Sequence, residues 1–338
     1  MTSTRTQSDT SRYRADHREQ SREQASAAHC LLTISDDGFV AGTEMLIFSF
    51  LRNNPWFRGR ICVLCDQSLG DASRTRLARL GPVEFIRPGT DLEQRVGALA
   101  AAIPELRAAG PRFASLEAFG LDRFERVVYI DSDAFVTGDI SALFFNEHSL
   151  LACADGSHYD ELLGDATVAR VANQRRYGAA LSRCFNTGVL SIGAGMLDSA
   201  LRDRLVADID PATWAEVETL GWTDQLILNR RFAGCATLLD GRYNYMPVLE
   251  AKIRSAYRLH FHDARIVHMA GRYKPWEPRP PALFGQAPSL AKFYELWQQL
   301  EDLMPRAASS DAVDASLAFE TSQMQAVMQP RTELEPMP

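Results

Sequence analysis

The segment RVVYIDSDAFVTGD, residues 126–139, joins a buried strand to a pair of aspartates. Residues 127–130 form a continuous apolar run, which is typical of a strand covered on both faces of a sheet. Asp131 and Asp133 follow, and residues two apart on an extended chain share one face. Two carboxylates so close repel each other, and a divalent cation is the obvious compensation. The segment therefore predicts a strand that ends in a candidate metal site.

Segments of this kind recur and alternate with helical patterns. Strands are predicted at 30–35, 60–66, 82–86, 126–131, 149–155, 188–193, 236–240 and 264–268. Helices are predicted at 40–52, 72–80, 115–122, 195–207, 212–220, 223–231 and 288–303. The alternation predicts an α/β fold with a mostly parallel, Rossmann-like central sheet flanked by helices. Such sheets bind ligands at the carboxyl ends of their strands, which is where the two aspartates lie.

The two ends of the chain contain little that could form a core. Residues 1–28 are rich in Ser, Arg, Gln and Glu and are predicted to be a disordered tail. Residues 306–338 are rich in Ala, Ser and Pro and are predicted to be a flexible or partly helical tail, with a candidate amphipathic helix at 313–328. A single catalytic domain is predicted at 29–305.

Composition excludes several classes of protein. The net charge of −7 does not indicate a nucleic-acid surface, and no run approaches the ~20 apolar residues of a membrane span. With no secretory signal pattern, the predicted location is the cytoplasm. The six cysteines lie mostly in apolar stretches, so we expect buried structural thiols and not zinc or redox sites, including the CxxC of Cys62 and Cys65.

Three interpretations of the D-x-D pair are open. The first is a surface turn. The second is a phosphohydrolase of the haloacid-dehalogenase type, but that class needs Thr four residues after its nucleophile, where this chain has Phe135. The third is a metal-dependent nucleotide-sugar site, in which a cation held by carboxylates neutralises a departing diphosphate.

A second segment, RIVHMAGRYKPW at 265–276, supports the third interpretation. An apolar strand ends on His268, and Gly271 and Lys274 follow within seven residues. A neutral imidazole completes a carboxylate site suited to Mn²⁺, and a lysine offers a compact charge to a phosphate. His260 and His262 are alternative candidates for the metal ligand.

These motifs together resemble the glycogenin-like retaining glycosyltransferases of family 8, which have the GT-A fold. The resemblance includes H-x-x-G-x-x-K-P-W behind a strand-terminal D-x-D. Four further blocks occur in family order, namely TISDDGFVAGTEML (33–46), CFNTGVLSIG (184–193), WTDQLILN (222–229) and GRYNYMP (241–247).

The resemblance implies a set of site residues. Asp131, Asp133 and His268 would bind Mn²⁺, with Mg²⁺ as the alternative ion. The UDP-sugar donor would contact Thr33, Ser35, Asp36, Phe39, Ser132, Asn186, Thr187, Gly271 and Lys274. The catalytic candidates are Asp155, Asp224 and Gln225, among which the sequence does not choose.

Structural roles compete for several of these residues. Asp36 and Asp37 could cap the following helix, Asn186 could be a turn residue, and Asp224 could be a helix N-cap. One departure from the family pattern is Ser115, where many relatives carry Lys or Arg. A cation at that position would help to hold the donor.

The resulting hypothesis is a metal-dependent retaining transferase of a hexose from a UDP-sugar to a hydroxyl acceptor. That acceptor would be a glycan, a lipid-linked glycan or a small molecule, and the long polar segment at 156–183 is predicted to lie on its side. The alternative is a non-catalytic nucleotide-sugar-binding homologue, which Ser115 favours. The sequence leaves a homo-oligomer open.

Overall fold

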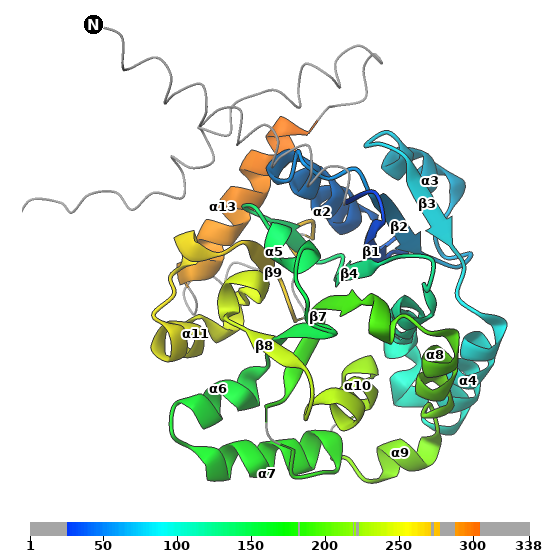
Figure 1. The fold of residues 1–338 in the computed structure, drawn as a ribbon, viewed down its shortest axis with the longest axis vertical. Coiled ribbons are helices and arrows are strands. Elements are labelled where there is room, and N and C mark those ends of the chain that lie inside the picture. Colours follow the sequence, from blue (N-terminus) through cyan, green and yellow to red (C-terminus); the bar gives the residue numbers. More distant parts are fainter. Residues whose placement is uncertain are drawn as a thin grey trace, which may run out of the picture.

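The fold is known from a computed structural model that describes residues 26–304 except 182, 219, 221, 222, 272, 273 and 278–287. In these residues a seven-stranded sheet has the order β3-β2-β1-β4-β7-β6-β8 (Figure 1). Its strands are β1 (His29–Ile34), β2 (Arg60–Leu64), β3 (Val83–Ile86), β4 (Arg126–Ile130), β6 (Leu150–Ala154), β7 (Phe185–Gly193) and β8 (Thr237–Leu239). A separate pair consists of β5 (Ala134–Val136) and β9 (Ile266–His268).

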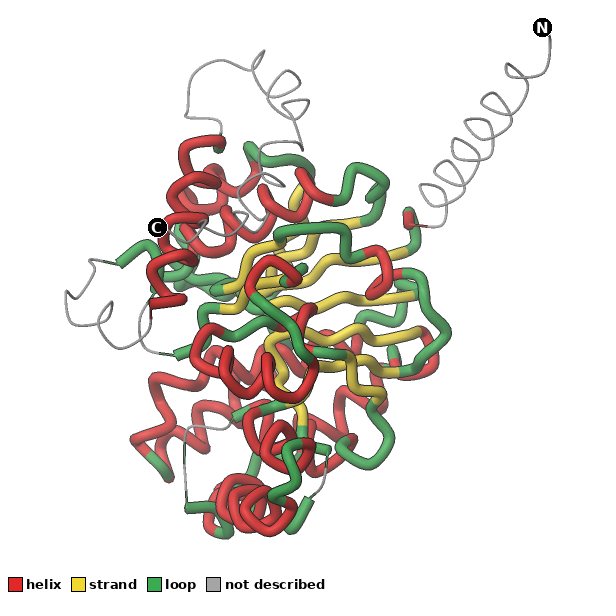
Figure 2. Tube along the Cα trace, turned by 90° about the vertical axis from the view of Figure 1, so that its left-hand side faces the viewer, coloured by secondary structure: helices red, strands yellow, loops and turns green. Residues whose placement is uncertain are grey.

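Strands β1 to β4 form the parallel half of the sheet, as the sequence predicts. Beyond β4 the described sheet is mixed, because β7 runs antiparallel to both of its neighbours. The strands run side by side in Figure 2. The predicted α/β fold with a mostly parallel central sheet is confirmed.

Helices cover both faces of the sheet. The α-helices are α2 (Val40–Asn53), α3 (Asp71–Ala78), α4 (Thr90–Ala102), α5 (Ser141–Phe144), α6 (Gly156–Leu162), α7 (Ala166–Tyr177), α8 (Ser199–Ala207), α9 (Pro211–Ala215), α10 (Asp224–Phe232), α11 (Glu250–Tyr257) and α13 (Pro288–Leu303). The 3₁₀ segments are η1 (Pro104–Gly120), η2 (Ala194–Met196), η3 (Gly241–Asn244), η4 (Pro247–Leu249) and η5 (Phe261–Asp263).

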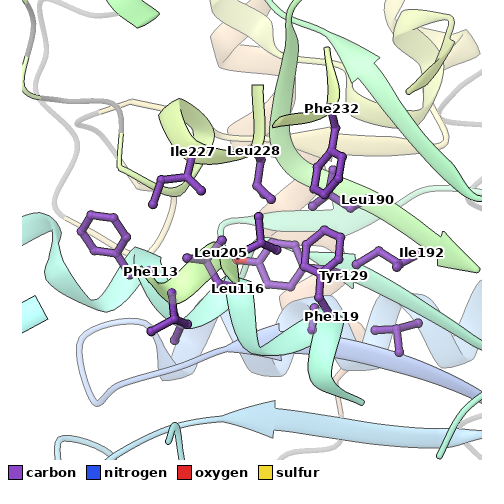
Figure 3. Close-up of a cluster of buried hydrophobic side chains, with 14 of the residues drawn as sticks. Phe113, Leu116, Phe119, Tyr129, Leu190, Ile192, Leu205, Ile227, Leu228 and Phe232 are labelled. Atoms are coloured by element: carbon purple, nitrogen blue, oxygen red, sulfur yellow. The ribbon is translucent and has the colours of Figure 1, made fainter. Parts of the chain in front are cut away.

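The alternation of buried side chains along each strand builds two cores. On β1, Leu31 packs with α2 on one face, whereas Cys30 and Leu32 belong to the cluster on the other face. That second cluster joins β4 and β7 to η1, α8 and α10 through Phe113, Leu116, Phe119, Tyr129, Leu190, Ile192, Leu205, Ile227, Leu228 and Phe232 (Figure 3). Burial on both faces explains why these strands are continuous apolar runs.

A third cluster holds the β5–β9 pair against α13 and α11. Phe135 of β5 packs edge-on against Trp297 of α13, with ring centroids 5.9 Å apart. Helix α13 also lies beside α2 (Figure 1). This packing ties the C-terminal part of the described chain to the segment that follows the D-x-D pair.

Several predicted helices differ from the observed ones. The helix expected at 195–207 splits into η2 and α8, because Asp198 is extended and caps α8 through the amide of Ala200. The helix expected at 212–220 ends at Ala215, and 115–122 corresponds to the end of the 3₁₀ segment η1. Helices α4, α5, α6, α7 and α11 and strand β5 are additions to the predicted elements.

The predicted tails lie mainly outside the described residues. Of the N-terminal tail, 26–28 are described, and Ser26 is buried with its hydroxyl donating to the Trp56 carbonyl, so the packed chain includes residues before 29. The candidate helix at 313–328 lies outside the described residues. The domain limits remain predictions.

Most of the thiols are buried, as the sequence predicts. Five of the six cysteines are buried and free, and Cys235 is exposed. Among the described residues, no helix combines the length and the apolar character that a membrane span requires.

Candidate active site

Asp131 and Asp133 lie in the short connection between β4 and β5. The turn is closed by the amide of Ala134, which donates to the Asp131 carbonyl at 3.0 Å. Tyr129, two residues earlier and on the same face of the strand, donates its hydroxyl to Asp131 Oδ1 at 2.5 Å. The pair is thus held by the sheet and does not form a free surface turn.

Pairing of β5 with β9 brings His268 to these aspartates. The two strands are antiparallel, and Ala134 lies directly opposite His268. The His268 Nε2 atom lies 3.1 Å from Asp133 Oδ1 and 3.6 Å from Asp131 Oδ2. One ligand atom from each of the three residues lies within 4.8 Å of the others, and this is the one such cluster in the described part of the chain.

His260 and His262 are therefore not brought into this cluster. Their rings stack on each other at a centroid distance of 5.6 Å, and His262 pairs with Asp263. The predicted ligand His268 is the histidine that the fold places beside the aspartates.

Lys274 adds a positive charge to the cluster. Its Nζ atom lies 2.5 Å from Asp133 Oδ2 and donates to the Met269 carbonyl at 3.0 Å. The Met269 amide in turn donates to the Asp133 carbonyl at 2.9 Å. The chain after β9 therefore folds back along the aspartates, and the two predicted motifs form one site.

The two acids of the cluster differ. Partial burial, partly offset by His268, raises the pKa of Asp131, whose side chain is 35% exposed, above its ordinary value. Burial also acts to raise the pKa of Asp133, but His268 and Lys274 outweigh it and hold that pKa well below its ordinary value. For His268, burial lowers the pKa, yet the neighbouring Asp133 and Asp131 bring it above its ordinary value. The cluster favours positive charge between its carboxylates.

The three residues fit a divalent cation. Carboxylate oxygens and an imidazole nitrogen are a donor set that suits Mn²⁺. The far side of the His268 ring is held as in metal-binding histidines, because Nδ1 lies 2.8 Å from Asn244 Oδ1. The ring is 3% exposed, so Nε2 is directed at the two carboxylates and not at solvent.

The opening loop after β1 lies against the same site. Thr33 is fully buried and its Oγ1 has no hydrogen-bond partner among the described residues. The Ser35 and Thr43 hydroxyls are 2.7 Å apart. Asp36 Oδ1 accepts the Phe39 amide at 2.9 Å, which makes a turn before α2, and Asp37 accepts the Gly70 amide at the start of α3.

Trp276 connects this loop to the KPW segment. Its indole NH donates to the Gly38 carbonyl at 3.1 Å, and its ring meets Phe39 edge-on at 5.6 Å. The Lys274 Nζ atom lies 5.8 Å from the centre of the Phe39 ring. Phe39 therefore lies close to the cation that touches Asp133.

Two further predicted residues lie in the backbone segments that form the site. Ser132 belongs to the D-x-D turn, and Gly271 belongs to the segment after β9. A Cβ on Gly42 of α2 would lie 2.2 Å from the Ser132 carbonyl oxygen, so α2 approaches the D-x-D turn very closely. Gly271 has φ +111°, a conformation that favours glycine.

Asn186, Thr187 and Gly188 come from an irregular part of β7. The register against β6 jumps from Leu190 to Asn186, which indicates a bulge, a feature common next to active sites. The Gly188 carbonyl accepts the Asp131 amide at 2.9 Å. Asn186 Oδ1 accepts the Gly188 amide, and Nδ2 donates to Gln225 Oε1 at 3.1 Å.

Asp224 and Gln225 begin α10. The N-cap is Thr223, so Asp224 is the first helical residue and not the cap. Its carboxylate accepts the Ser115 hydroxyl at 2.9 Å and the Thr223 hydroxyl at 3.0 Å. Ser115, where the chain departs from the family pattern, therefore contacts a candidate catalytic residue and offers it a neutral hydroxyl in place of a cation.

Asp155 is the N-cap of α6. Its Oδ1 accepts the amides of Ser157 and His158, and its Oδ2 accepts the Tyr177 hydroxyl at 2.7 Å. Arg176 Nη1 lies 3.8 Å from the same Oδ2. These contacts favour a positioning role over that of a nucleophile.

Three residues of the site were not predicted. Tyr129 could have been found from its spacing of two residues to Asp131. Asn244 lies in the quoted block 241–247 but received no role, and Tyr177 lies in the segment expected to face the acceptor. Neither has a local signal, because their partners are distant in sequence.

The sheet and its Asp-Asp-His cluster define the class of protein. Residues 111–279 match the family model described as Glycosyl transferase family 8. The match spans half of the chain, and the chain belongs to this family. Membership removes the phosphohydrolase alternative.

Individual relatives agree with this assignment. The curated Glycosyltransferase GlyF of Streptococcus pneumoniae serotype 4 is 29% identical over 184 residues, which are 53% of this chain and 38% of GlyF. The chain thus spans well under half of the length of that relative.

Solved structures share the fold. The galactosyltransferase LgtC, crystallised with donor and acceptor sugar analogues, has a TM-score of 0.57 at 19% identity, with 85% of this chain and 99% of LgtC covered. The glycosyltransferase GlyE of Streptococcus pneumoniae TIGR4 has a TM-score of 0.53 at 20% identity, with 90% and 66% covered. The expected GT-A type of fold is confirmed.

Proposed function

We propose that the protein is a metal-dependent retaining glycosyltransferase that transfers a hexose from a UDP-sugar to a hydroxyl of a carbohydrate or glycan acceptor. The observation that carries the proposal is the cluster of Asp131, Asp133 and His268, of which Asp133 and His268 are buried, with Lys274 in contact. Family membership supplies the reaction class, and the cluster would hold the ion that neutralises a diphosphate leaving group.

The cluster would hold Mn²⁺, or Mg²⁺ as the alternative, through Asp131, Asp133 and His268. When bound, the ion would neutralise negative charge on the departing UDP. Lys274 would bind the diphosphate from the other side, with Gly271 permitting close backbone approach. Ser132 would contact the ribose.

The loop between β1 and α2 would bind the uridine. Thr33, Ser35 and Asp36 offer hydroxyl and carboxylate groups, and Phe39 offers a ring against which a base can stack. The Thr33 hydroxyl has no hydrogen-bond partner among the described residues, which supports this role because buried polar groups in proteins are normally hydrogen-bonded.

Asn186, Thr187, Asp224 and Gln225 would face the donor sugar, whose hydroxyls need both donors and acceptors. Retention requires either a group beneath the anomeric carbon or attack on the same face as departure. Because Asp155 caps α6, Asp224 and Gln225 are the groups we propose for contact with the reacting sugar. In same-face attack the leaving phosphate oxygen takes the acceptor proton, so no separate base is needed.

The direct test is UDP release from a panel of UDP-sugars, with Mn²⁺ and then with EDTA. We expect one donor to be turned over and EDTA to abolish that turnover, with recovery when Mn²⁺ is restored. Turnover that is indifferent to EDTA and Mn²⁺ would refute metal dependence.

Asp224→Asn should separate catalysis from binding. Loss of the charge should lower UDP release by about 10²–10³-fold, since Asp224 would face positive charge that develops on the sugar. Binding of UDP with Mn²⁺, measured by calorimetry, should stay unchanged because Asp224 is not a metal ligand.

The matched control is Asp210→Asn, which replaces an exposed N-cap of α9 by another good cap and should leave both quantities unchanged. Equal loss of UDP binding and turnover in Asp224→Asn would contradict the assigned role.

The non-catalytic nucleotide-sugar-binding homologue is the second candidate. The neutral Ser115 beside Asp224 is the observation in its favour. Tight metal-dependent UDP binding without turnover of any donor, in the presence of acceptor sugars, would support it over the transferase.

A further inference from the structure

A continuous chain of hydrogen bonds connects the metal cluster to Asp155. His268 Nδ1 contacts Asn244 Oδ1 at 2.8 Å, and Asn244 Nδ2 donates to Asn186 Oδ1 at 2.8 Å. Asn186 Nδ2 donates to Gln225 Oε1 at 3.1 Å, and Gln225 Nε2 donates to the Tyr177 hydroxyl at 2.8 Å. The Tyr177 hydroxyl donates to Asp155 Oδ2 at 2.7 Å.

The backbone amide of Gly188 determines which atoms donate and which accept in the part of this hydrogen-bond chain nearest the metal cluster. The Gly188 NH can only donate, and it points at Asn186 Oδ1 at 2.9 Å, so that atom is the carbonyl oxygen. The Asn244 atom that also contacts Asn186 Oδ1 must then be its amide nitrogen. The other Asn244 atom is an oxygen, which only accepts, and His268 Nδ1 must carry a proton. The remaining nitrogen, Nε2, faces Asp131 and Asp133.

The Gly188 amide also determines which atoms donate and which accept in the part of the hydrogen-bond chain between Asn186 and Asp155. With Asn186 Oδ1 accepting, Asn186 Nδ2 must donate to Gln225 Oε1. Gln225 Nε2 therefore donates to the Tyr177 oxygen, and the Tyr177 proton is directed to the Asp155 carboxylate. The orientation of each side-chain amide in this hydrogen-bond chain is therefore determined by its two ends, the Gly188 NH, which can only donate, and the Asp155 carboxylate, which accepts.

Burial makes these orientations stable. Asn244 and Tyr177 are both fully buried, and Gln225 is 4% exposed, so water does not compete for their hydrogen bonds. Reversal of any one amide would leave buried donors facing donors and acceptors facing acceptors, which is costly.

We propose that Asn244 and Tyr177 are positioning residues of the reaction, an inference that rests on the proposed function. Asn244 holds the His268 ring in the tautomer that presents an unprotonated Nε2 to a metal ion. Tyr177 holds the Gln225 amide, with its NH₂ group toward the Tyr177 hydroxyl and its carbonyl oxygen toward Asn186. Asn186 joins the two halves, so the metal ligand and the sugar-facing amide are oriented together.

The Asn244 part is tested by metal affinity. In Asn244→Leu the His268 ring loses its partner, and Mn²⁺ affinity measured by calorimetry should fall by about 10–100-fold, as for other outer partners of metal-binding histidines. Asn244→Asp keeps an acceptor for Nδ1 but loses the donor to Asn186 Oδ1, so it should retain more of the Mn²⁺ affinity than Asn244→Leu. Asn54→Leu removes an equally buried asparagine whose partners are the backbone of Phe50 and Ile140, and it should leave Mn²⁺ affinity unchanged.

The tautomer can be read without metal or activity. Nitrogen chemical shifts of the His268 ring in the metal-free protein, recorded at a pH high enough to leave the ring neutral, should show a protonated Nδ1, and Asn244→Leu should lose that preference. An unprotonated Nδ1 in the unmodified protein, or equal Mn²⁺ affinity in Asn244→Leu, would overturn the role of Asn244. Absence of Mn²⁺ binding by the unmodified protein, with the Nδ1 proton present, would instead overturn the proposed function.

The Tyr177 part is tested by the separation of kcat from KM. Tyr177→Phe should lower kcat by about 10–100-fold through a misplaced Gln225, with Mn²⁺ affinity and the KM for the donor unchanged. Tyr159→Phe is the matched control, because Tyr159 is fully buried and its hydroxyl has no hydrogen-bond partner among the described residues. Unchanged kcat in Tyr177→Phe, or an equal loss in both variants, would overturn the role of Tyr177.

Discussion

Asp133→Asn should abolish metal-dependent turnover, with a fall in UDP release on the order of 10³-fold. Asp133 lies at the centre of the cluster, since one carboxylate oxygen is 3.1 Å from His268 and the other is 2.5 Å from Lys274. The amide has the same shape but no charge, so it is a poor ligand and leaves Lys274 without its buried counter-ion. Turnover of the donor identified in the panel, at saturating Mn²⁺, is the measurement.

The control for this variant is Asp139→Asn. Asp139 lies six residues further along, is exposed, and accepts the Ser141 amide, which an asparagine can also do. Its variant should retain turnover. If Asp133→Asn kept more than a tenth of the turnover of the unmodified protein, the cluster would not be the place where the diphosphate charge is neutralised.

Gly188→Ala should displace the ligands of the same site, because Gly188 of β7 packs directly against them. A Cβ at this position would lie 2.3 Å from His268 Cε1 and 2.8 Å from Asp131 Oδ2, distances that side chains do not tolerate. Either the ring moves or β7 does, and such overpacking costs about 1–3 kcal/mol of folding free energy. We expect a lower melting temperature and an Mn²⁺ affinity reduced by at least about tenfold, because the displaced ring is a ligand.

Gly195→Ala provides the comparison, because a Cβ on Gly195 has nothing within 4 Å. That variant should retain both melting temperature and Mn²⁺ affinity. A Gly188→Ala protein that binds Mn²⁺ as tightly as the unmodified protein would show that His268 is not held against β7 as the structure has it.

The parallel half of the sheet was predictable because its strands are buried on both faces. In β1, β2 and β4 most residues are apolar, and such runs bounded by polar turns have few alternative interpretations. The helix at 288–303 was predicted with its observed ends. By contrast, the 3₁₀ geometry of η1 and the early end of α9 at Ala215 were not predicted. Both depend on contacts with neighbouring elements, which the helical pattern of the sequence does not contain.

The amino-acid sequence by itself determined the class of fold, the strand-terminal aspartates and the candidates His268 and Lys274, because these follow from local hydrophobic patterns and motif chemistry. Only the tertiary structure decided which histidine meets the aspartates, since this depends on the pairing of β5 with β9 across more than a hundred residues. It also decided that Asp155 caps α6, that Ser115 contacts Asp224, and that Asn244 and Tyr177 join the site. The physical reason is that hydrogen bonds between distant side chains leave no periodic trace in the sequence.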